Sequence, residues 1–471
     1  MQKVISKYGT AAHLALLTVA PLFLFPFFSP DAVAGVLLWF SVLAAIWVLM
    51  GPSRRLDETA HEARLRVVAT CLRDPLFWFS LLLAVLAGVR WLNSGVDLAY
   101  NAEREVWVMS DSYFPMLPGS VSGVGMLPFA TAVALFVLLA GVRHALGRQA
   151  RMSFVVVASI LSGIAALVSV LSISFGNEVV KALSFCDYSR PENLGTAFGL
   201  FLLGGVVALF GCVELRWLKV ELLVAVSLAA NAVALLVFAP VATLLVFVAA
   251  FFVLVVISFI LTRKVLIGTG SFRCALVILL SVVVAGLFAV FAPKGFSISG
   301  KVEDILALTV FPQDFASLRS TLSHIAFRAW KEMPWTGSGL GAFPINIRFF
   351  ATVADWKFIH PGQIAVPNGW WQLLVERGVV GALSFAIAFG MLIWTYFRRI
   401  ICSFGRINWR PLLMLGPIAL LALVALTFVD CSLMRADVLL TVCGFLALSA
   451  SDIPERKRVK DAKVMEDGDV R

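Results

Sequence analysis

The chain has 471 residues, of which 61% are hydrophobic and 14% are charged, with a formal net charge of +10. A typical soluble domain is about 45–50% apolar and about 25% charged, whereas here the apolar residues form runs of roughly 18–23, long enough to cross a hydrocarbon core about 30 Å thick. This excludes an ordinary soluble enzyme, a disulfide-rich scaffold and a disordered protein, and it also excludes an outer-membrane barrel, whose strands alternate and give no long apolar runs.

Twelve apolar segments predict an all-α, polytopic membrane protein. In chain order they are 10–29, 32–51, 75–93, 125–145, 153–175, 195–213, 220–238, 240–262, 274–293, 379–397, 410–429 and 435–451. The first segment is followed at once by Pro30, Asp31 and a second apolar run. A cleaved signal peptide would instead end at a small-residue site before a polar mature start, so we expect the first span to be retained.

The distribution of basic residues predicts the orientation. Most of the 38 Lys and Arg residues lie in the two termini and in the connections around 52–74, 143–152, 214–219, 263–273 and 398–410. Basic connections stay in the cytoplasm, so an even number of spans puts both termini there. The tail sequence Arg456, Lys457, Arg458, Lys460 suits an anionic leaflet. Because the charge is spread over short loops, we expect membrane lipids and no nucleic acid as partners.

The longest connection, 294–378, lies on the opposite, outer side and is too long for a plain loop. It is rich in Trp and Phe, which a disordered segment would lack. Within it, residues 315–333 place Phe315, Leu322 and Ala329 at helical spacing. We therefore expect a small helical cap near the membrane surface.

These boundaries divide the chain into four parts. They are a bundle of nine spans (1–293), the cap (294–378), three further spans (379–451) and a basic cytoplasmic tail (452–471).

No pattern in the chain predicts a metal or a cofactor. The seven cysteines show no CxxC spacing, and there is no metal-ligand motif or Walker loop. The run Gly-Ser-Gly-Leu-Gly at 337–341 is accompanied by neither a strand nor a lysine, so it is a weak nucleotide signal.

Polar groups gather on the predicted outer side, where they are the informative minority of an apolar chain. The cap and the loop before the sixth span supply Arg190, Asn193, Arg319, His324, Arg328, Arg348, His360, Asn368 and Glu376. Arginines just above a membrane suit an anionic group such as a lipid-linked phosphate or diphosphate. The alternative is that these arginines extend to lipid headgroups.

Several residues of the cap have a second, structural interpretation. The turn glycines, including Gly339 and Gly341, either expose amides beside an anion or make a plain tight turn. Glu376 either takes part in chemistry or hydrogen-bonds the start of the tenth span. Asn193 and Asn368 either orient sugars or serve as turn and cap residues.

The order of these residues resembles the O-antigen ligase and polysaccharide polymerase superfamily. That family has a large periplasmic loop with an arginine, a proline, a Gly-x-Gly-x-Gly-x-Phe turn, a His-Asn pair and a Glu-x-Gly-x-x-Gly element at the next span. The matching residues are Arg319, Pro334, Gly337, Gly339, Gly341, Phe343, Asn368, Glu376, Gly378 and Gly381. Before the sixth span, Asn193 matches a second family element.

The chain departs from the family pattern at two places. Pro367 stands where the family has the histidine expected to activate an acceptor hydroxyl, so His360 and His324 are the alternatives for a base. The arginine that the family tends to carry near the start of its middle spans is missing from the turn at 238–241. Arg190 or Arg348 would have to take its place.

The resemblance implies a glycan transferase in the bacterial inner membrane, without metal or other cofactor. Its donor would be an oligosaccharide on a polyprenyl diphosphate, and its acceptor another lipid-linked repeat or a lipid A core. Arg319 would stabilise the leaving diphosphate, helped by Arg190, Arg328 or Arg348. Other proteins of lipopolysaccharide or exopolysaccharide assembly would be partners.

Several alternatives stay open at this point. The pattern does not distinguish a polymerase from a ligase, and a flippase for the same lipids or a non-catalytic relative would share the topology. A multispan glycosyltransferase that uses lipid-phosphate sugars is disfavoured, because its substantial acidic first outer loop is here only Ser29, Pro30 and Asp31.

Overall fold

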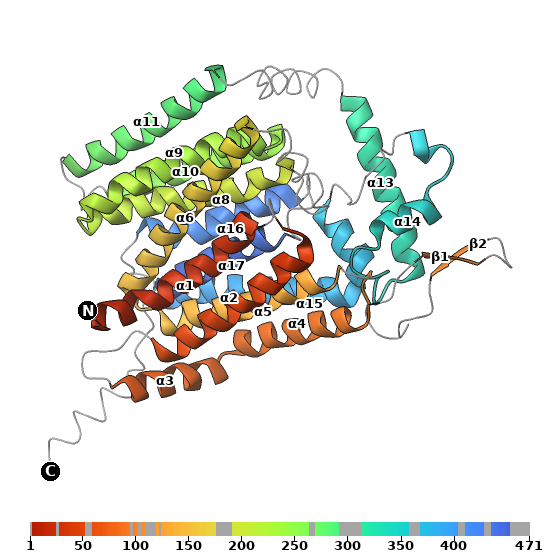
Figure 1. The fold of residues 1–471 in the computed structure, drawn as a ribbon, viewed down its shortest axis with the longest axis horizontal. Coiled ribbons are helices and arrows are strands. Elements are labelled where there is room, and N and C mark those ends of the chain that lie inside the picture. The colour runs from red at the N-terminus through yellow and green to blue at the C-terminus, as the bar shows by residue number, and fades with distance from the viewer. Residues whose placement is uncertain are drawn as a thin grey trace, which may run out of the picture.

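The computed structural model of the chain shows long helices lying alongside one another, with a smaller cap at one end (Figure 1). It describes residues 2–24, 28–51, 59–94, 98–101, 106–109, 119–121, 124–175, 191–262, 269–291, 312–357, 368–403, 410–427 and 435–452. The N-terminus of the first helix lies at the end of the bundle opposite the cap.

Nine of the described helices are long and apolar enough to cross a membrane. They are α2 (Pro30–Met50), α4 (Pro75–Leu92), α5 (Met126–Ala140) with the π-helical turn η1 (Gly141–Ala145), α6 (Arg148–Phe175), α8 (Pro191–Glu214), α9 (Leu218–Phe238), α10 (Val241–Thr262), α11 (Thr269–Phe291) and α15 (Gly369–Ser403). Three more carry shorter apolar stretches, namely α1 (Gln2–Leu24), α16 (Pro411–Thr427) and α17 (Ala436–Asp452).

Every one of the twelve predicted segments overlaps one of these helices. The prediction of a helical, multi-pass membrane protein is confirmed at this level. The number of crossings and the side on which each end lies stay predictions.

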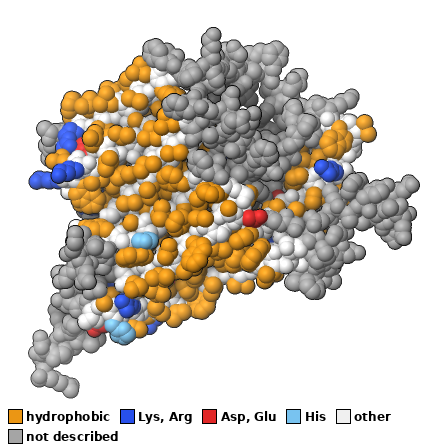
Figure 2. All heavy atoms as spheres, viewed as in Figure 1, with side chains coloured by type: hydrophobic (Ala, Val, Ile, Leu, Met, Phe, Trp, Pro, Cys, Tyr) orange, Lys and Arg blue, Asp and Glu red, His pale blue; other side chains and the backbone are white. Residues whose placement is uncertain are grey.

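The outer surface of the bundle is apolar, as a lipid-facing surface requires. Trp39, Leu222, Phe252 and Phe272 are each more than two-thirds exposed. Figure 2 shows hydrophobic side chains over most of the described surface on one face. Exposed apolar area of this extent is rare on a soluble monomer.

The core of the bundle is built around α8, whose apolar stretch is almost entirely buried. Phe198, Phe201 and Phe210 on α8 are buried, and α6, α9, α10 and α17 pack around this helix. Small residues let the helices approach closely. A Cβ added to Gly163 of α6 would meet Ser227 of α9 at 2.4 Å, the kind of contact that holds helices together in lipid.

The cap is a small helical unit with its own apolar cluster. Helix α13 (Pro312–Glu332) packs against α14 (Phe343–Phe350) and the start of α15. Leu322, Ile325 and Phe343 are fully buried between them. The helix predicted for 315–333 is confirmed by α13.

Some described elements had no counterpart in the sequence-based expectations. They are the surface helix α3 (Ala60–Leu72), the antiparallel hairpin of β1 (Leu98–Asn101) and β2 (Val106–Met109), and the 3-10 turn η3 (Asp355–Lys357). Within the described part of the chain, β1 and β2 are the only strands. Helix α3 begins with a capping box formed by Thr59 and Glu62.

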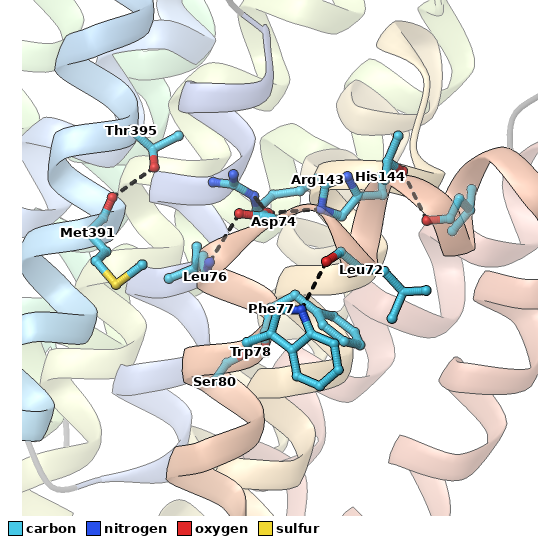
Figure 3. A network of polar contacts seen from close by, with 12 residues as sticks. Leu72, Asp74, Leu76, Phe77, Trp78, Ser80, Arg143, His144, Met391 and Thr395 are labelled. Carbon is cyan, nitrogen blue, oxygen red and sulfur yellow. Dashed lines mark hydrogen bonds and ion pairs between the residues drawn. The ribbon is translucent and has the colours of Figure 1, made fainter.

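A buried ion pair fixes the junction between α3, α4 and η1 (Figure 3). Asp74 caps α4 by accepting the N–H of Leu76 at 3.1 Å. Its second oxygen accepts a hydrogen bond from Nε of Arg143 at 2.8 Å and lies 2.9 Å from Nε2 of His144. Burial alone would raise the pKa of Asp74, but the hydrogen bond with His144 and the charge of Arg143 outweigh it, so this pKa lies below its usual 3.8.

We predict that Asp74→Asn reduces the acid sensitivity of the protein. A carboxyl whose pKa is lowered by folding stabilises the fold above its unfolded pKa, and this contribution is lost as the pH falls through the folded value. Between about pH 7 and about pH 3, the Tm of the purified wild-type protein should therefore fall further than that of the variant. At neutral pH the variant should be less stable by roughly 3–5 kcal/mol, because Arg143 is left buried without its partner.

The control is Asp31→Asn, at an exposed position in the first turn of α2. It should follow the wild type at both pH values. Equal acid sensitivity of Asp74→Asn and the wild type would contradict the assignment.

Candidate functional site

The glycine turn of the cap and the start of α15 touch along their backbones. Gly337, Gly339 and Gly341 have φ values of 74°, 102° and 75°, which residues with a side chain rarely adopt. A Cβ on Gly337 would lie 2.5 Å from the backbone nitrogen of Gly378, and one on Gly378 would lie 2.3 Å from the carbonyl oxygen of Trp335. No side chain fits between the two segments.

Helix α15 is interrupted where the turn meets it. Gly378 has φ 62° and ψ −173°, outside helical values. The freed groups find partners just before the turn, since the N–H of Val379 donates to Pro334 O at 2.8 Å and that of Val380 to Trp335 O at 3.2 Å. Helix α15 thus starts ten residues before the predicted tenth span, and its interruption falls at the predicted boundary.

The carboxylate of Glu376 joins the two segments. Its Oε1 accepts the backbone N–H of Gly341 at 3.1 Å and the side-chain amide of Gln372 at 2.5 Å. Glu376 is only 5% exposed. A second link runs from Asn346 Nδ2 to Ser338 Oγ at 2.7 Å, and Ser338 Oγ donates to Val375 O at 3.1 Å. These hydrogen bonds hold the turn against α15.

Arg90, at the end of α4, completes the junction from the other side. Its guanidinium donates to the carbonyl oxygens of Glu376 and Arg377 at 3.4 and 3.1 Å, just before the interruption of α15. The carbonyl of Arg90 accepts the hydroxyl of Ser120 at 2.9 Å. Arg90 is 6% exposed, so it acts here as a buried clamp on the backbone.

A short segment in the connection between α4 and α5 joins the same place. Leu340 in the glycine turn donates to Gly119 O at 3.1 Å and accepts the N–H of Val121 at 2.9 Å. The site is thus a four-part junction, which we call the cap junction: the end of α4, residues 119–121, the turn 337–343 and residues 372–381 of α15.

Sequence reasoning did not assign Arg90 to the site. The available signal was an arginine near the end of an otherwise apolar span, a position at which an ionisable residue usually has a specific partner. The partners are carbonyls more than 280 positions away, and no local pattern points to them.

Two predicted residues are found in structural contacts. Asn368 Oδ1 accepts the N–H groups of Trp370 and Trp371 at 3.0 and 3.3 Å, and so caps α15. The amide of Gly341 is occupied by Glu376, and those of Gly337, Ser338 and Leu340 also donate within the protein. These contacts favour the tight-turn and cap alternatives for Gly341 and Asn368.

The described basic residues of the cap differ in their contacts. Arg328 donates to Phe350 O at 3.1 Å and pairs with Asp355 at 3.3 Å, holding α13 to the segment after α14. The N–H of Thr352 lowers the pKa of Asp355 most, and the charge of Arg328 lowers it further. Burial opposes this shift in part. His324 on α13 and Arg348 on α14 are exposed.

Arg319 lies in α13, and the description of this residue is limited to its place in the helix. Three and seven positions further on are Leu322 and Ala326, both fully buried in the cap cluster. A helix returns to nearly the same face after three, four and seven residues. Position 319 is therefore in helical register with these two residues.

Three other candidates cannot be placed. Arg190 and His360 lie outside the described residues, and Asn193 is described only as part of the first turn of α8. Glu376 and Gly341 are the two candidates that the structure brings into direct contact, with Gly339 in the same turn. In the described part of the chain, no cluster of three potential metal ligands occurs.

Among known proteins, no family model and no curated protein matches this chain. Membership of the O-antigen ligase and polymerase superfamily stays a prediction that rests on the motif residues and their placement.

We predict that Glu376→Ala weakens the cap junction. The N–H of Gly341 and the amide of Gln372 lose a buried acceptor, which costs about 1–3 kcal/mol for each group. Glu376→Gln keeps one acceptor oxygen and should be intermediate. The measurements are the Tm in detergent and the rate of protease cleavage in the turn 337–343.

Glu332→Ala is the matched control, since Glu332 is exposed at the end of α13. It should leave both quantities unchanged. A Glu376→Ala protein as stable and as protease-resistant as the wild type would show that the carboxylate does not hold the junction.

Proposed function

We propose that the chain is a glycan transferase of the bacterial inner membrane. It moves an oligosaccharide from a polyprenyl-diphosphate donor to a glycan acceptor at the periplasmic face. The acceptor is a second lipid-linked repeat for a polysaccharide polymerase, or a lipid A core for an O-antigen ligase.

The contact between Gly341 and Glu376 is the observation that carries this proposal. The two residues belong to separate parts of the motif, 35 positions apart in the chain. The turn Gly337–Phe343 and the element Glu376–Gly381 form one folded unit at the end of a membrane-spanning bundle. The contacts within this unit explain why these glycines and this glutamate occur together. An accidental match to the family pattern would not bring the two parts into contact.

The register of α13 supports the proposed role of Arg319. Its position is in helical register with the buried residues Leu322 and Ala326 of the same helix. A guanidinium stays charged at any physiological pH and is costly to bury without an anion. A diphosphate group held against the cap is such an anion, and Arg319 would bind it through two parallel hydrogen bonds.

The chemistry is a substitution at the anomeric carbon of the donor sugar. The acceptor hydroxyl forms the new C–O bond, the bond from that carbon to the diphosphate breaks, and its electron pair leaves with the polyprenyl diphosphate. The proton of the hydroxyl goes to a base, for which His324 and His360 are the candidates. Arg319 stabilises the charge that develops on the leaving group.

The cap junction has a supporting part in this scheme. Arg90 and Glu376 are occupied with backbone and amide groups of the protein, so they hold the cap in place over the end of the bundle. We place the donor diphosphate at the N-terminal half of α13, next to position 319.

We predict that Arg319→Ala abolishes formation of the glycan chain while the protein still inserts into the membrane. Loss of one positioned charge donor lowers a reaction rate by about 10²–10³-fold. The measurement is the length distribution of surface glycan in cells that depend on this chain. The matched control, Lys331→Ala, removes an exposed cation from the same helix and should leave the distribution unchanged. Normal chain lengths in the Arg319 variant would refute the assignment.

A reconstitution experiment separates transferase from flippase. In liposomes that contain the polyprenyl-diphosphate-linked oligosaccharide and an acceptor, we predict a longer or transferred glycan together with free polyprenyl diphosphate. Scrambling of the lipid between leaflets with no transfer product would favour a flippase. Neither product nor scrambling, with folded protein, would favour a non-catalytic relative.

A further inference from the structure

A cavity of about 280 Å³ lies between α6, α8 and α16. It is lined by the start of α6, the end of α8 and the start of α16. Helix α15 runs from the cap to Ser403, shortly before α16 begins, so this cavity is at the end of the bundle opposite the cap. It is separate from the cap junction, and the proposed reaction makes no use of it.

The cavity carries one charge of each sign. Glu214 at the end of α8 and Arg410 before α16 both line it, and Oε1 of Glu214 lies 3.1 Å from Nη2 of Arg410. The two side chains are 22% and 29% exposed, respectively. They are therefore reachable from outside and are not sealed into the core.

The rest of the lining is largely apolar. Met152, Val207, Phe210 and Leu412 contribute to it. A Cβ on Gly211 would meet the sulfur of Met152 at 2.3 Å, so the glycine allows Met152 to pack against α8. The site thus combines a charged pair with an apolar wall at the end of membrane-spanning helices.

We propose that this cavity binds the headgroup of a phospholipid that has a primary ammonium and a phosphate, as in phosphatidylethanolamine. The ammonium faces Glu214 and the phosphate faces Arg410, while the glycerol end of the lipid lies against the apolar wall. A simple anion would be repelled by Glu214, and a simple cation by Arg410. The contact between Glu214 and Arg410 joins one carboxylate oxygen to one guanidinium nitrogen. A carboxylate has a second oxygen and a guanidinium has five N–H donors, so a zwitterion can bind both side chains of the pair at once.

The primary ammonium also predicts which phospholipid headgroup binds most tightly. A primary ammonium donates hydrogen bonds to a carboxylate, as a lysine does, whereas the quaternary group of a choline lipid has no N–H to donate. A glycerol headgroup has no positive charge. The order of preference is therefore ethanolamine over choline and glycerol lipids.

The test uses the full-length protein in nanodiscs with equal parts of phosphatidylethanolamine, phosphatidylcholine and phosphatidylglycerol. Native mass spectrometry then identifies the lipids that each chain retains. The wild type should keep phosphatidylethanolamine preferentially. Glu214→Gln should lower that preference by about three- to tenfold, the effect of losing one partly exposed charge-assisted hydrogen bond.

Glu221→Gln is the matched control. Glu221 forms an ion pair with Arg273 at the same end of the bundle, and neither residue lines the cavity. This variant should retain the wild-type preference. If Glu214→Gln does not give a monodisperse protein, Arg410→Gln tests the phosphate side of the same site and should lower the retention of phosphatidylethanolamine.

The space itself is tested by Met152→Phe, which places a bulkier side chain in the cavity wall. This variant should lose retained phosphatidylethanolamine while the purified protein stays monodisperse in lipid-free detergent. Equal retention of the three lipids by the wild type, a preference for phosphatidylglycerol, or an unchanged preference in both charge variants would overturn the proposal.

Discussion

The need to pair every buried backbone group governs the part of this molecule on which the candidate site depends. The interruption of α15 at Gly378 frees carbonyl and N–H groups in a largely buried part of the chain, where such groups need hydrogen-bond partners. The carbonyls of Pro334 and Trp335, just before the glycine turn, accept the N–H groups, and Arg90 donates to two of the carbonyls. The cap is therefore more than the connection between α11 and α15. It supplies hydrogen-bond partners for the backbone groups at the interruption of α15.

The same constraint explains how the few charged residues are used. Most described ionic contacts lie where helices begin or end: Asp74 with Arg143, Glu214 with Arg410, and Glu221 with Arg273. Each pair joins elements that are separate in sequence and lies near the ends of apolar spans, where charge is least costly. The described ion pairs at the end of the bundle opposite the cap join helix ends to one another, whereas Arg90 and Glu376 hold the cap.

The cap has a structural role in packing against the start of α15 and carries Arg319, the residue proposed to bind the donor diphosphate. Its apolar cluster fixes α13, the helix that carries Arg319, against α14 and α15. Arg328, by contrast, is engaged by Asp355 and Phe350. The arginines of the cap are thus not equivalent, although their type and loop are the same.

The sequence by itself determined the membrane class, the helical segments and the cap helix α13, because long apolar runs and helical periodicity are local properties. It also marked the glycines, Asn368 and Glu376 as unusual. Only the tertiary structure decided that Glu376 bonds to Gly341 and that Arg90 clamps α15, because these contacts span 35 and 286 positions. The residue types determine which hydrogen bonds are possible, and the packing of the chain determines which partners form them. A buried carboxylate must find a donor, but which one depends on the helices that bring it there.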